Sequence, residues 1–452
     1  MGVGILAFII YIVAIIFFSV VLHKHITQSL LYALLILIAI ALVSGGNVPT
    51  MLAEGLTFAI FQEATFAILA FVYMAYVMEK TQTIQRLIHI LEGLLGQLAG
   101  GAAYVSVIAS ALFGMVSGSG TGNASTVGSI TIPWMVGTGW SKERATAIVA
   151  GNAGLGIVFP PSSSMFLLLG MPVIAAELTS GDLYLTLLGA ALIVLLYRLI
   201  LVAIYVRKDS IKPTKTGNVR FSEVLRLDWP ALLIFLGILI PLLITDGPLG
   251  KLLNQTSFGP EGVDSISIIV WIPVLTTLLT FIVGRKNLPR TIKGWITFNQ
   301  EAIPNFKEIG LLIICAFTAS RVLVNLGLET EIASILEAIG SISPVLVILV
   351  VALLLTVTVG PFSATATTTA LGSVAYMALR GAGLAPAAAC TVFLILISNE
   401  GCVPPSSAPI YIACGISGLG DPSRVFKSVL LHFAVPTICI ALLIALGTIP
   451  TF

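Results

Sequence analysis

The chain has 452 residues, of which 58% are hydrophobic and 9% are charged, and its mean hydropathy is +1.08. Because a soluble domain carries a charge on about a quarter of its residues, this composition predicts an integral membrane protein and excludes a soluble fold. The formal net charge of +2 is spread over short loops, and no basic patch indicates nucleic-acid binding.

Apolar runs follow one another along the whole chain. A membrane-spanning helix needs about 20 apolar residues, and several runs are shorter than this. The first run lacks a cationic start and a cleavage site, so we expect a retained helix. We predict an all-α polytopic membrane protein with about 11–12 transmembrane segments. The runs are Gly4–Leu22, Leu30–Val43, Leu56–Met78, Ala102–Val116, Ala145–Phe159, Tyr184–Val206, Trp229–Thr245, Ile266–Val283, Ile309–Leu326, Pro344–Val359, Ala387–Ile397 and Val429–Leu446.

Basic residues orient these spans. They follow the first and third spans, at Lys24 and Lys80, and they crowd the loops 207–226 and 285–293. Loops rich in lysine and arginine remain on the cytoplasmic side. The acidic loop 246–264 and the N-terminus are therefore expected outside the cell.

The stretch "VSGSGTGNAST", residues 116–126, interrupts an apolar region with glycine and hydroxyl residues. Each flanking arm is too short to cross a core of about 30 Å at 1.5 Å per residue. This predicts a re-entrant helical hairpin. Further on, Pro160 and Pro161 remove two amide donors and break a helix, and Ser162 and Ser163 are placed to cap the next one.

The same features recur at a constant offset. Adding 244 to a position leads from Ser119 to Ser363, from Thr121 to Thr365, and from Pro160–Ser163 to Pro404–Ser407. The basic loops give the two copies opposite directions across the membrane. Inverted repeats with broken helices are typical of secondary transporters, which bind substrate and ions near the bilayer midplane.

The interruptions have complementary chemistry. Free carbonyls and the side chains of Ser119, Thr121 and Asn123 offer oxygen ligands for sodium, while amides at half-helix starts suit a carboxylate. The second half offers a similar set. It comprises Ser363, Thr365, Thr367, Thr368, Thr369, Asn399 and Glu400.

Other interpretations have weaker support. The alternating glycines of residues 118–122 resemble a dinucleotide-binding loop, but no strand precedes them, as such a loop requires. The fragment Thr-Val-Gly at residues 126–128 resembles part of a potassium-channel selectivity filter, but a filter needs four such fragments. Glycine-rich helix packing is the serious alternative, but it does not explain the repeated Pro-Pro-Ser block. No nucleophile–base pair or nucleotide motif indicates an enzyme. A channel or an ion antiporter stays open.

Several charged residues lie inside the apolar segments and need an explanation. Glu63 and Arg321 suit polar pairs between helices or an interfacial position. Glu400 lies four residues before Pro404, where it could contact an ion or substrate. Arg198 and Arg207, near the end of one span, are expected to extend to the cytoplasmic surface. The five cysteines lack ligand spacing and are expected to be small buried hydrophobes, so we predict no metal other than Na⁺ and no cofactor.

Two pairs of blocks carry a family resemblance. "SGSGTGNASTVGSITIPWM" with "GNAGLGIVFPPSSSMFLLLG", and "FSATATTTALGSVAYM" with "NEGCVPPSSAPIYIACGISG", resemble the large membrane subunit of tripartite ATP-independent periplasmic (TRAP) transporters. The order Asn-Ala-Ser-Thr leans toward the branch that uses TAXI-type binding proteins. The resemblance covers most of the chain, and it implies an elevator-type carrier, sodium symport, a small four-helix membrane partner and a periplasmic binding protein.

The resemblance also implies site residues near the hairpin tips and the Pro-Pro breaks. The ion ligands would be Ser117, Gly118, Ser119, Asn123, Gly156, Ser363, Thr365, Thr367 and Asn399. The substrate contacts would be Thr121, Ser125, Thr126, Pro161, Ser162, Ser163, Thr368, Thr369, Glu400, Pro405, Ser406 and Ser407.

These observations predict sodium-coupled uptake of a small organic anion across a bacterial or archaeal cell membrane. The alternative is a carrier or antiporter of the same superfamily that works without a binding protein. The expected domains are scaffold helices over 1–55, a first repeat over 56–206 with hairpin 101–136 and broken helix 145–176, a basic loop with connecting scaffold helices over 207–306, and a second repeat over 307–452 with hairpin 344–379 and broken helix 386–416.

Overall fold

The computed structural model describes residues 2–213, 221–245, 248–256, 259–264, 266–328, 330, 331, 334, 343–403 and 407–449. Over these residues the regular structure is helical and contains no strand, so the all-α prediction is confirmed. Among the described residues, four helical segments are long and apolar enough to cross a membrane, and the number rises to six if each of two bent pairs is one span. Seven shorter apolar helices accompany them, which is why hydropathy alone predicted about 11–12 segments.

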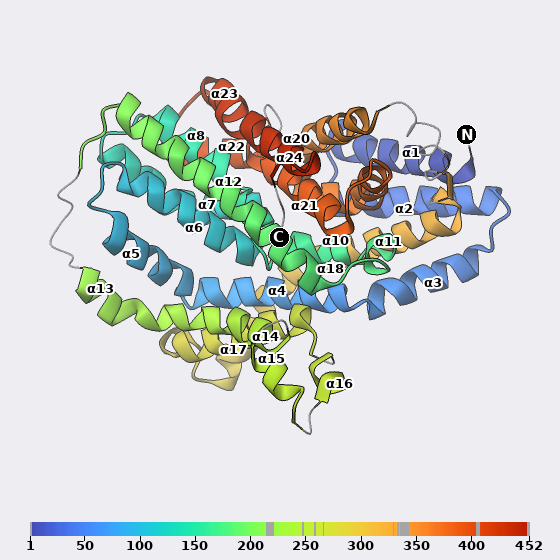
Figure 1. Ribbon diagram of the computed structural model, residues 1–452, viewed down its shortest axis with the longest axis horizontal. Helices are drawn as coiled ribbons and strands as arrows, with labels where there is room; N and C mark the ends of the chain where they lie inside the picture. The colour runs from blue at the N-terminus through green and yellow to red at the C-terminus, as the bar shows by residue number, and fades with distance from the viewer. Residues whose placement is uncertain are drawn as a thin grey trace.

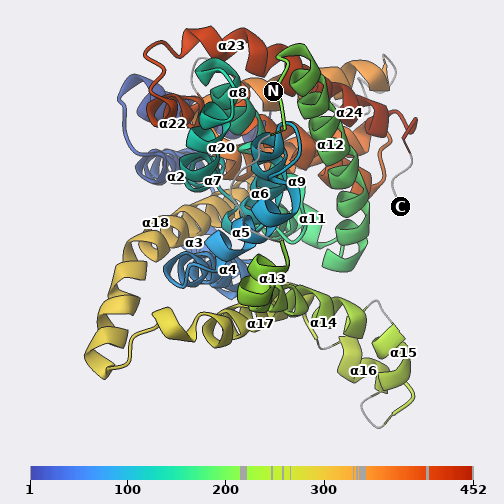
Figure 2. The same ribbon diagram turned by 90° about the vertical axis from the view of Figure 1, so that its left-hand side faces the viewer.

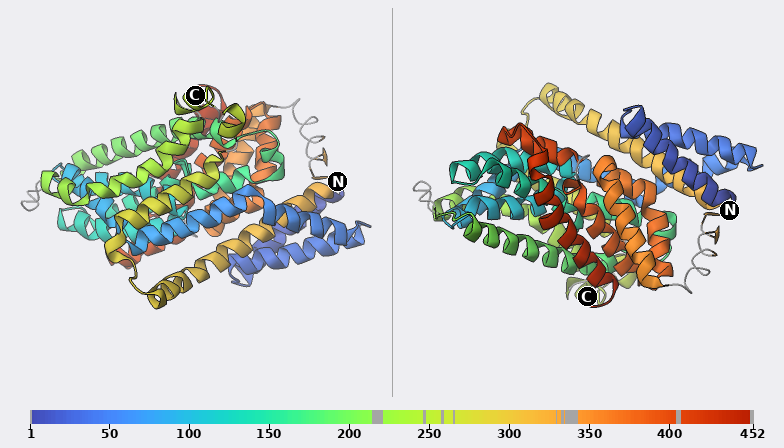
Figure 3. Two further views of the ribbon diagram at one scale, coloured as in Figure 1. Left: turned by 90° about the horizontal axis from the view of Figure 1, so that it is seen from below. Right: turned by 90° about the horizontal axis from the view of Figure 1, so that it is seen from above.

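One group of helices packs along α4 and α18 (Figures 1 and 3). The start of α3 is capped by the Asn47 side chain, which accepts a hydrogen bond from the Thr50 amide. Figure 2 shows α15 and α16 projecting away from the rest of the molecule. This group, called the scaffold below, comprises α1 (Val3–Ile16), α2 (Ile26–Val43), α3 (Val48–Phe61), α4 (Glu63–Lys80), α13 (Phe221–Asp228), α14 (Leu236–Thr245), α15 (Pro248–Leu253), α16 (Gly259–Asp264), α17 (Ile268–Val283) and α18 (Ile292–Asn325).

The remaining helices form a second group, called the repeat body, in which α7 packs on α22 and α12 packs on α21. Its longest regular helix begins with a capping box between Thr179 and Asp182, which satisfies amides at the helix start. The repeat body comprises α5 (Thr83–Leu95), α6 (Gly101–Ser117), α7 (Gly120–Gly137), α8 (Lys142–Asn152), α9 (Leu155–Val158), α10 (Ser163–Leu169), α11 (Pro172–Ala175), α12 (Ser180–Lys208), α20 (Pro344–Gly381), α21 (Pro386–Ile397), α22 (Ala408–Ser417), α23 (Ser423–Val429) and α24 (Val435–Ala445).

The helices recur at the offset that the sequence predicts. Helix α8 begins at Lys142 and α21 begins at Pro386, which are 244 residues apart. Helix α20 contains a non-helical residue, Ser363, which divides it into two arms. These arms occupy the places of α6 and α7 in the first half. The halves therefore share one order of elements.

Some predicted boundaries do not coincide with the helices. The predicted span Leu56–Met78 is bent by 47° between α3 and α4, at Gln62. The predicted domain limits at 55/56 and 306/307 fall inside α3 and α18. Hydropathy marks where a helix becomes apolar, whereas hydrogen bonding decides where it begins, so the two differ at amphipathic ends.

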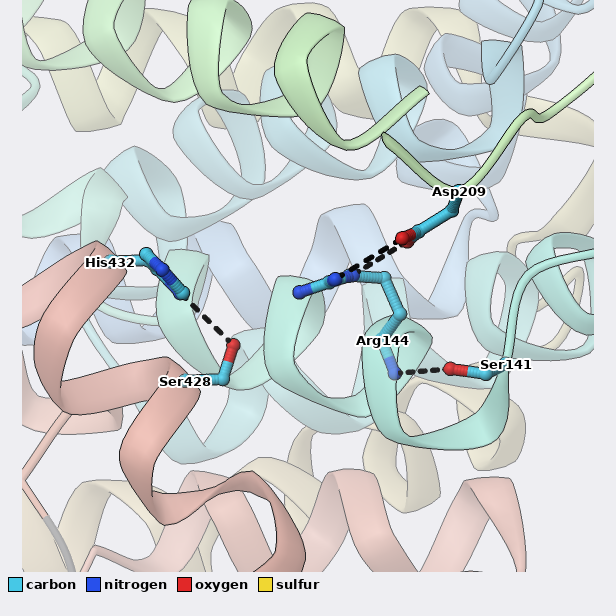
Figure 4. Close-up of polar contacts among 5 residues, drawn as sticks. All are labelled: Ser141, Arg144, Asp209, Ser428 and His432. Carbon is cyan, nitrogen blue, oxygen red and sulfur yellow. Dashed lines mark hydrogen bonds and ion pairs between the residues drawn. The ribbon is translucent and has the colours of Figure 1, made fainter. Parts of the chain in front are cut away.

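An ion pair joins α8 to the residue that follows α12 (Figure 4). The Arg144 Nε and Nη2 atoms donate to the Asp209 carboxylate at 2.7 and 3.3 Å, and the guanidinium carbon lies 3.8 Å from the centre of the Tyr205 ring. On the neighbouring α23 and the short π-helix Leu430–Ala434 that follows it, Ser428 Oγ and His432 Nδ1 are 3.4 Å apart. This cluster ties the first broken helix to α12.

The prediction for Arg198 is wrong. Its side chain is 2% exposed, and it donates to Thr437 Oγ1 at 2.8 Å while its guanidinium carbon lies 4.7 Å from the centre of the Phe433 ring. Because Thr437 of α24 and the Phe433 ring enclose the guanidinium group, the long side chain does not reach water. The preference of arginine for an interface gives way here to packing between two helices.

Candidate functional site

The tip of the first hairpin is a sharp reversal between α6 and α7. Gly118 has φ +60°, in the left-handed region that glycine adopts readily. Ser119 follows in an extended conformation, and its Oγ accepts a hydrogen bond from the Gly122 amide at 3.1 Å. A Cβ atom on Gly118 would lie 1.6 Å from Ser163 Oγ. The tip therefore touches the start of α10, directly after the Pro-Pro break.

The second tip has the same place in the other half. Ser363 has φ 69° and ψ 162°, a region that is occupied almost entirely by glycine and costs other residues about 1–3 kcal/mol. Its Oγ accepts a hydrogen bond from the Ala366 amide at 3.5 Å, as Ser119 does in the first half. Strained backbone conformations of this kind are found mainly at active sites and ligand-binding sites.

Behind each tip lies a buried oxygen without a hydrogen-bond partner among the described residues. Asn123 is fully buried, and its Nδ2 donates to the carbonyls of Ser110 and Ala153 at 2.9 and 2.7 Å, which leaves Oδ1 unpaired. Thr367 is also fully buried, with Oγ1 unpaired. The two residues are 244 positions apart. Buried polar atoms are usually paired, and these two unpaired oxygens occupy equivalent positions in the two halves.

The two broken helices cross with their backbones in contact. A Cβ atom on Gly154 would lie 2.0 Å from the Ser398 carbonyl oxygen, and one on Gly401 would lie 1.9 Å from the Ala150 carbonyl oxygen. In the first break, Ser162 Oγ accepts from the Met165 amide and caps α10. Glycine is required at these crossings because any side chain would push the helices apart.

A cavity of about 700 Å³ lies between the hairpin tips and the scaffold. The structure brings eight of the predicted site residues to its wall: Gly118, Ser119, Thr121, Thr126, Ser163, Ser363, Thr365 and Glu400. The sequence analysis missed the opposite wall, which includes Tyr76, Glu79, Asn305 and Glu308 on α4 and α18, and His25 before α2. No sequence signal marks these residues, because they reach the cavity through helix packing.

Other predicted residues lie away from this wall. The hydroxyls of Thr368 and Thr369 donate to the carbonyls of Ala364 and Ala366, and the hydroxyl of Ser407 donates to the carbonyl of Glu400. Pro161 borders a separate apolar cavity, and Ser125 is exposed. Ser162 is buried in its capping role. These six predicted substrate contacts do not border the cavity.

The remaining predicted ion ligands have different positions. Asn399 is fully buried, with both side-chain amide atoms unpaired among the described residues. Gly156 packs so closely on α6 that a Cβ atom would lie 2.0 Å from the Gly114 carbonyl carbon. Ser117 is the last residue of α6, and its side chain is not described. Pro405 and Ser406 lie outside the described residues.

Comparison with solved structures gives the fold. The chain superimposes on the Alcanivorax borkumensis YdaH transporter with a TM-score of 0.64 and 15% identity, over 88% of this chain and 87% of that one. It superimposes on Neisseria gonorrhoeae MtrF, described among antimetabolite efflux pumps, with a TM-score of 0.62 and 17% identity, over 88% and 83% of the two chains.

Sequence relatives are more specific. The ectoine TRAP transporter large permease protein TeaC of Halomonas elongata is 29% identical over 192 residues, which are 42% of either chain. The C4-dicarboxylate TRAP transporter large permease protein DctM of Vibrio cholerae is 30% identical over 191 residues, which are 42% of this chain and 40% of that one. These matches therefore span about two fifths of each relative. The profile of the tripartite ATP-independent periplasmic transporter, DctM component, matches residues 5–451, and the chain belongs to this transporter family.

Proposed function

We propose that this chain is the subunit of a TRAP transporter that moves a small organic acid into the cell together with sodium ions. The observation that carries the proposal is the pair of buried, unpaired oxygens on Asn123 and Thr367. Sodium bound at these positions would satisfy both atoms, and unwound segments of half-helices are where secondary transporters coordinate sodium. The substrate carboxylate would meet backbone amides at the half-helix starts.

The transport path would run through the cavity between the hairpin tips and the scaffold. Hydroxyls of Ser119, Thr121, Ser363 and Thr365 border it on one side. Irregular backbone at membrane depth survives only where protein, water or a ligand satisfies it, so we propose that both hairpins are re-entrant. In this proposal the repeat body moves against the scaffold as an elevator and carries the bound ions and substrate.

The partners follow from the family. The proposed complex contains a small four-helix membrane subunit and a periplasmic binding protein that delivers the substrate, in the inner membrane of a bacterium or the cell membrane of an archaeon. The N-terminus is proposed to lie outside, from the distribution of basic loops. Relatives named for ectoine and for C4-dicarboxylates support a small organic acid as the cargo.

Reconstituted vesicles test the proposal. The complex is expected to accumulate the ligand of its binding protein only when sodium is more concentrated outside and the binding protein is present. Potassium in place of sodium serves as the control. Uptake without sodium would contradict the coupling. Uptake without any binding protein would favour the alternative, a carrier that works alone.

A further inference from the structure

We propose that the substrate of this chain bears a cationic nitrogen in addition to its acid group, and that Glu400 binds this nitrogen. The inference rests on the proposed transport function and names the substrate class more closely: zwitterions such as amino acids or quaternary-ammonium acids, in preference to acids without nitrogen. It is carried by the charged and aromatic residues that border the cavity, and by the absence of an acid at the position equivalent to Glu400 in the first repeat.

The ionisable residues that line the cavity are almost all acidic. Glu79, Glu308 and Glu400 border it, with His25 as the one basic group among the described lining residues and no lysine or arginine. His25 Nε2 lies 3.5 Å from Glu308 Oε1 and so is already paired with an acid. A substrate with two carboxylates would meet mostly repulsion here, whereas a cationic group would be attracted.

Glu400 occupies a position that has no acid in the other repeat. Its counterpart 244 residues earlier is Gly156, next to the first Pro-Pro break. The Glu400 side chain is 3% exposed, and no lysine, arginine or histidine of the described residues lies within ion-pair distance of it. A buried carboxylate without a cationic partner is costly, so we take its presence in only one repeat as a sign of a cationic ligand.

A backbone amide donates to the Glu400 carboxylate. The Gly120 amide, the first of α7, donates to Oε2 at 3.3 Å. An ionised carboxylate has about four acceptor positions, and this amide occupies one of them. A protonated amine supplies up to three donors and the opposite charge.

Aromatic rings border the same cavity. Phe113 precedes the first hairpin tip by a few residues, Phe362 lies directly before Ser363 in the second, and Tyr76 on α4 borders the cavity from the scaffold. The face of an aromatic ring attracts organic cations, including quaternary ammonium groups that cannot donate a hydrogen bond. One carboxylate with several rings is therefore a suitable pocket for an alkylated or free ammonium group.

Matched pairs of compounds test the inference. Each pair has the same acid group and nearly the same shape, but one member has a cationic nitrogen: glycine betaine and 3,3-dimethylbutanoate, 4-aminobutanoate and pentanoate, aspartate and succinate. The measurement is the rise in unfolding temperature of the purified membrane complex as each compound is titrated, with sodium or with potassium. We expect at least one nitrogen-bearing member to bind about tenfold more tightly than its partner.

Two variants connect this preference to Glu400. Glu400→Gln keeps the shape and the acceptor for the Gly120 amide but removes the charge, so the preference within each pair is expected to fall to about one. Glu301→Gln is the control, because Glu301 pairs with Lys80 and does not border the cavity, and it should keep the preference. The folded yield of both variants in detergent checks that the chain still folds.

Three results would overturn the inference. The first is that the wild-type complex prefers none of the nitrogen-bearing compounds. The second is an unchanged preference in Glu400→Gln, which is expected if Glu400 only caps α7. The third is a Glu400→Gln variant that loses its response to sodium while the preference remains. Sodium-driven uptake of the nitrogen-free acids would keep the proposed function and reject this inference. Binding and uptake that ignore sodium would reject the proposed coupling independently of the compound preferred.

Discussion

At the scale of single residues, Asn123 and Thr367 are an equivalent pair in the two halves of the chain. They occupy equivalent positions, each is fully buried, and each has one oxygen without a partner among the described residues. An unpaired buried acceptor costs about 1–3 kcal/mol. A bound cation at both positions would remove this cost.

The substitution Thr367→Val tests the second of these positions. Valine keeps the branched shape but lacks the hydroxyl, so the stability without sodium is expected to stay the same or to rise by up to about 1 kcal/mol. The sodium concentration for half-maximal uptake is expected to rise about tenfold or more, which corresponds to about 1.4 kcal/mol of lost binding. Both quantities are measured on the reconstituted complex.

Thr358→Val is the matched control for this substitution. Thr358 lies in the first arm of α20, and its hydroxyl donates to the Leu354 carbonyl at 2.8 Å. Its removal should leave the sodium dependence unchanged. If Thr367→Val also kept the wild-type sodium dependence, Thr367 would not be an ion ligand.

At the scale of helices, the crossing of the two broken helices depends on backbone contact. Gly154 faces the Ser398 carbonyl and Gly401 faces the Ala150 carbonyl, so neither crossing has room for a side chain. The same crossing holds the carbonyls of both interruptions near the hairpin tips. Close packing at this point therefore positions the groups that the proposed ion sites need.

Gly401→Ala is expected to destabilise the protein. Its Cβ would lie 1.9 Å from a backbone oxygen, which no rotation of a side chain can relieve, and overpacking of this kind costs about 1–3 kcal/mol. The measurement is the unfolding temperature in detergent together with the yield of monodisperse protein. Gly415→Ala in α22 is the control, because a Cβ there meets nothing within 4 Å. An equal stability of the two variants would contradict the close crossing.

At the scale of the whole molecule, several polar contacts join the scaffold to the repeat body. One is Ser320 on α18 with Ser373 on α20, whose Oγ atoms are 3.3 Å apart. Another is Gln62, whose Nε2 donates to the Gly170 carbonyl at 3.2 Å. An elevator mechanism requires such contacts to break as the repeat body moves, whereas contacts inside the body persist.

Cysteine pairs distinguish these two kinds of contact. A disulfide between cysteines at Ser320 and Ser373 is expected to reduce uptake to near background and reduction is expected to restore it. A disulfide between cysteines at Thr146 and Ser417, which are 2.8 Å apart through their hydroxyls within the repeat body, should be tolerated. Both pairs are made with Cys439→Ser, since Cys439 is exposed. Full transport by the oxidised Ser320 and Ser373 pair would exclude movement at this interface.

The sequence by itself determined the membrane class, the repeat at an offset of 244 residues and the places where helices break. Hydropathy, glycine clusters and Pro-Pro pairs are local signals, because each depends on residues that lie close together along the chain. The structure that they indicate can therefore be predicted from the sequence. The tips at Ser119 and Ser363 and the cap at Ser162 lie where these local signals predict them.

Only the tertiary structure decided which residues meet. It buried Arg198 instead of extending it to a surface, it turned the hydroxyls of Thr368 and Thr369 toward their own helix, and it brought Tyr76 and Glu308 to the cavity wall. These outcomes depend on contacts between helices that are far apart in the chain, and a helix carries no local mark of its distant neighbour. For the same reason, the absence of an ion pair between Glu400 and any basic residue in the described part of the chain became visible only once the helices were in place.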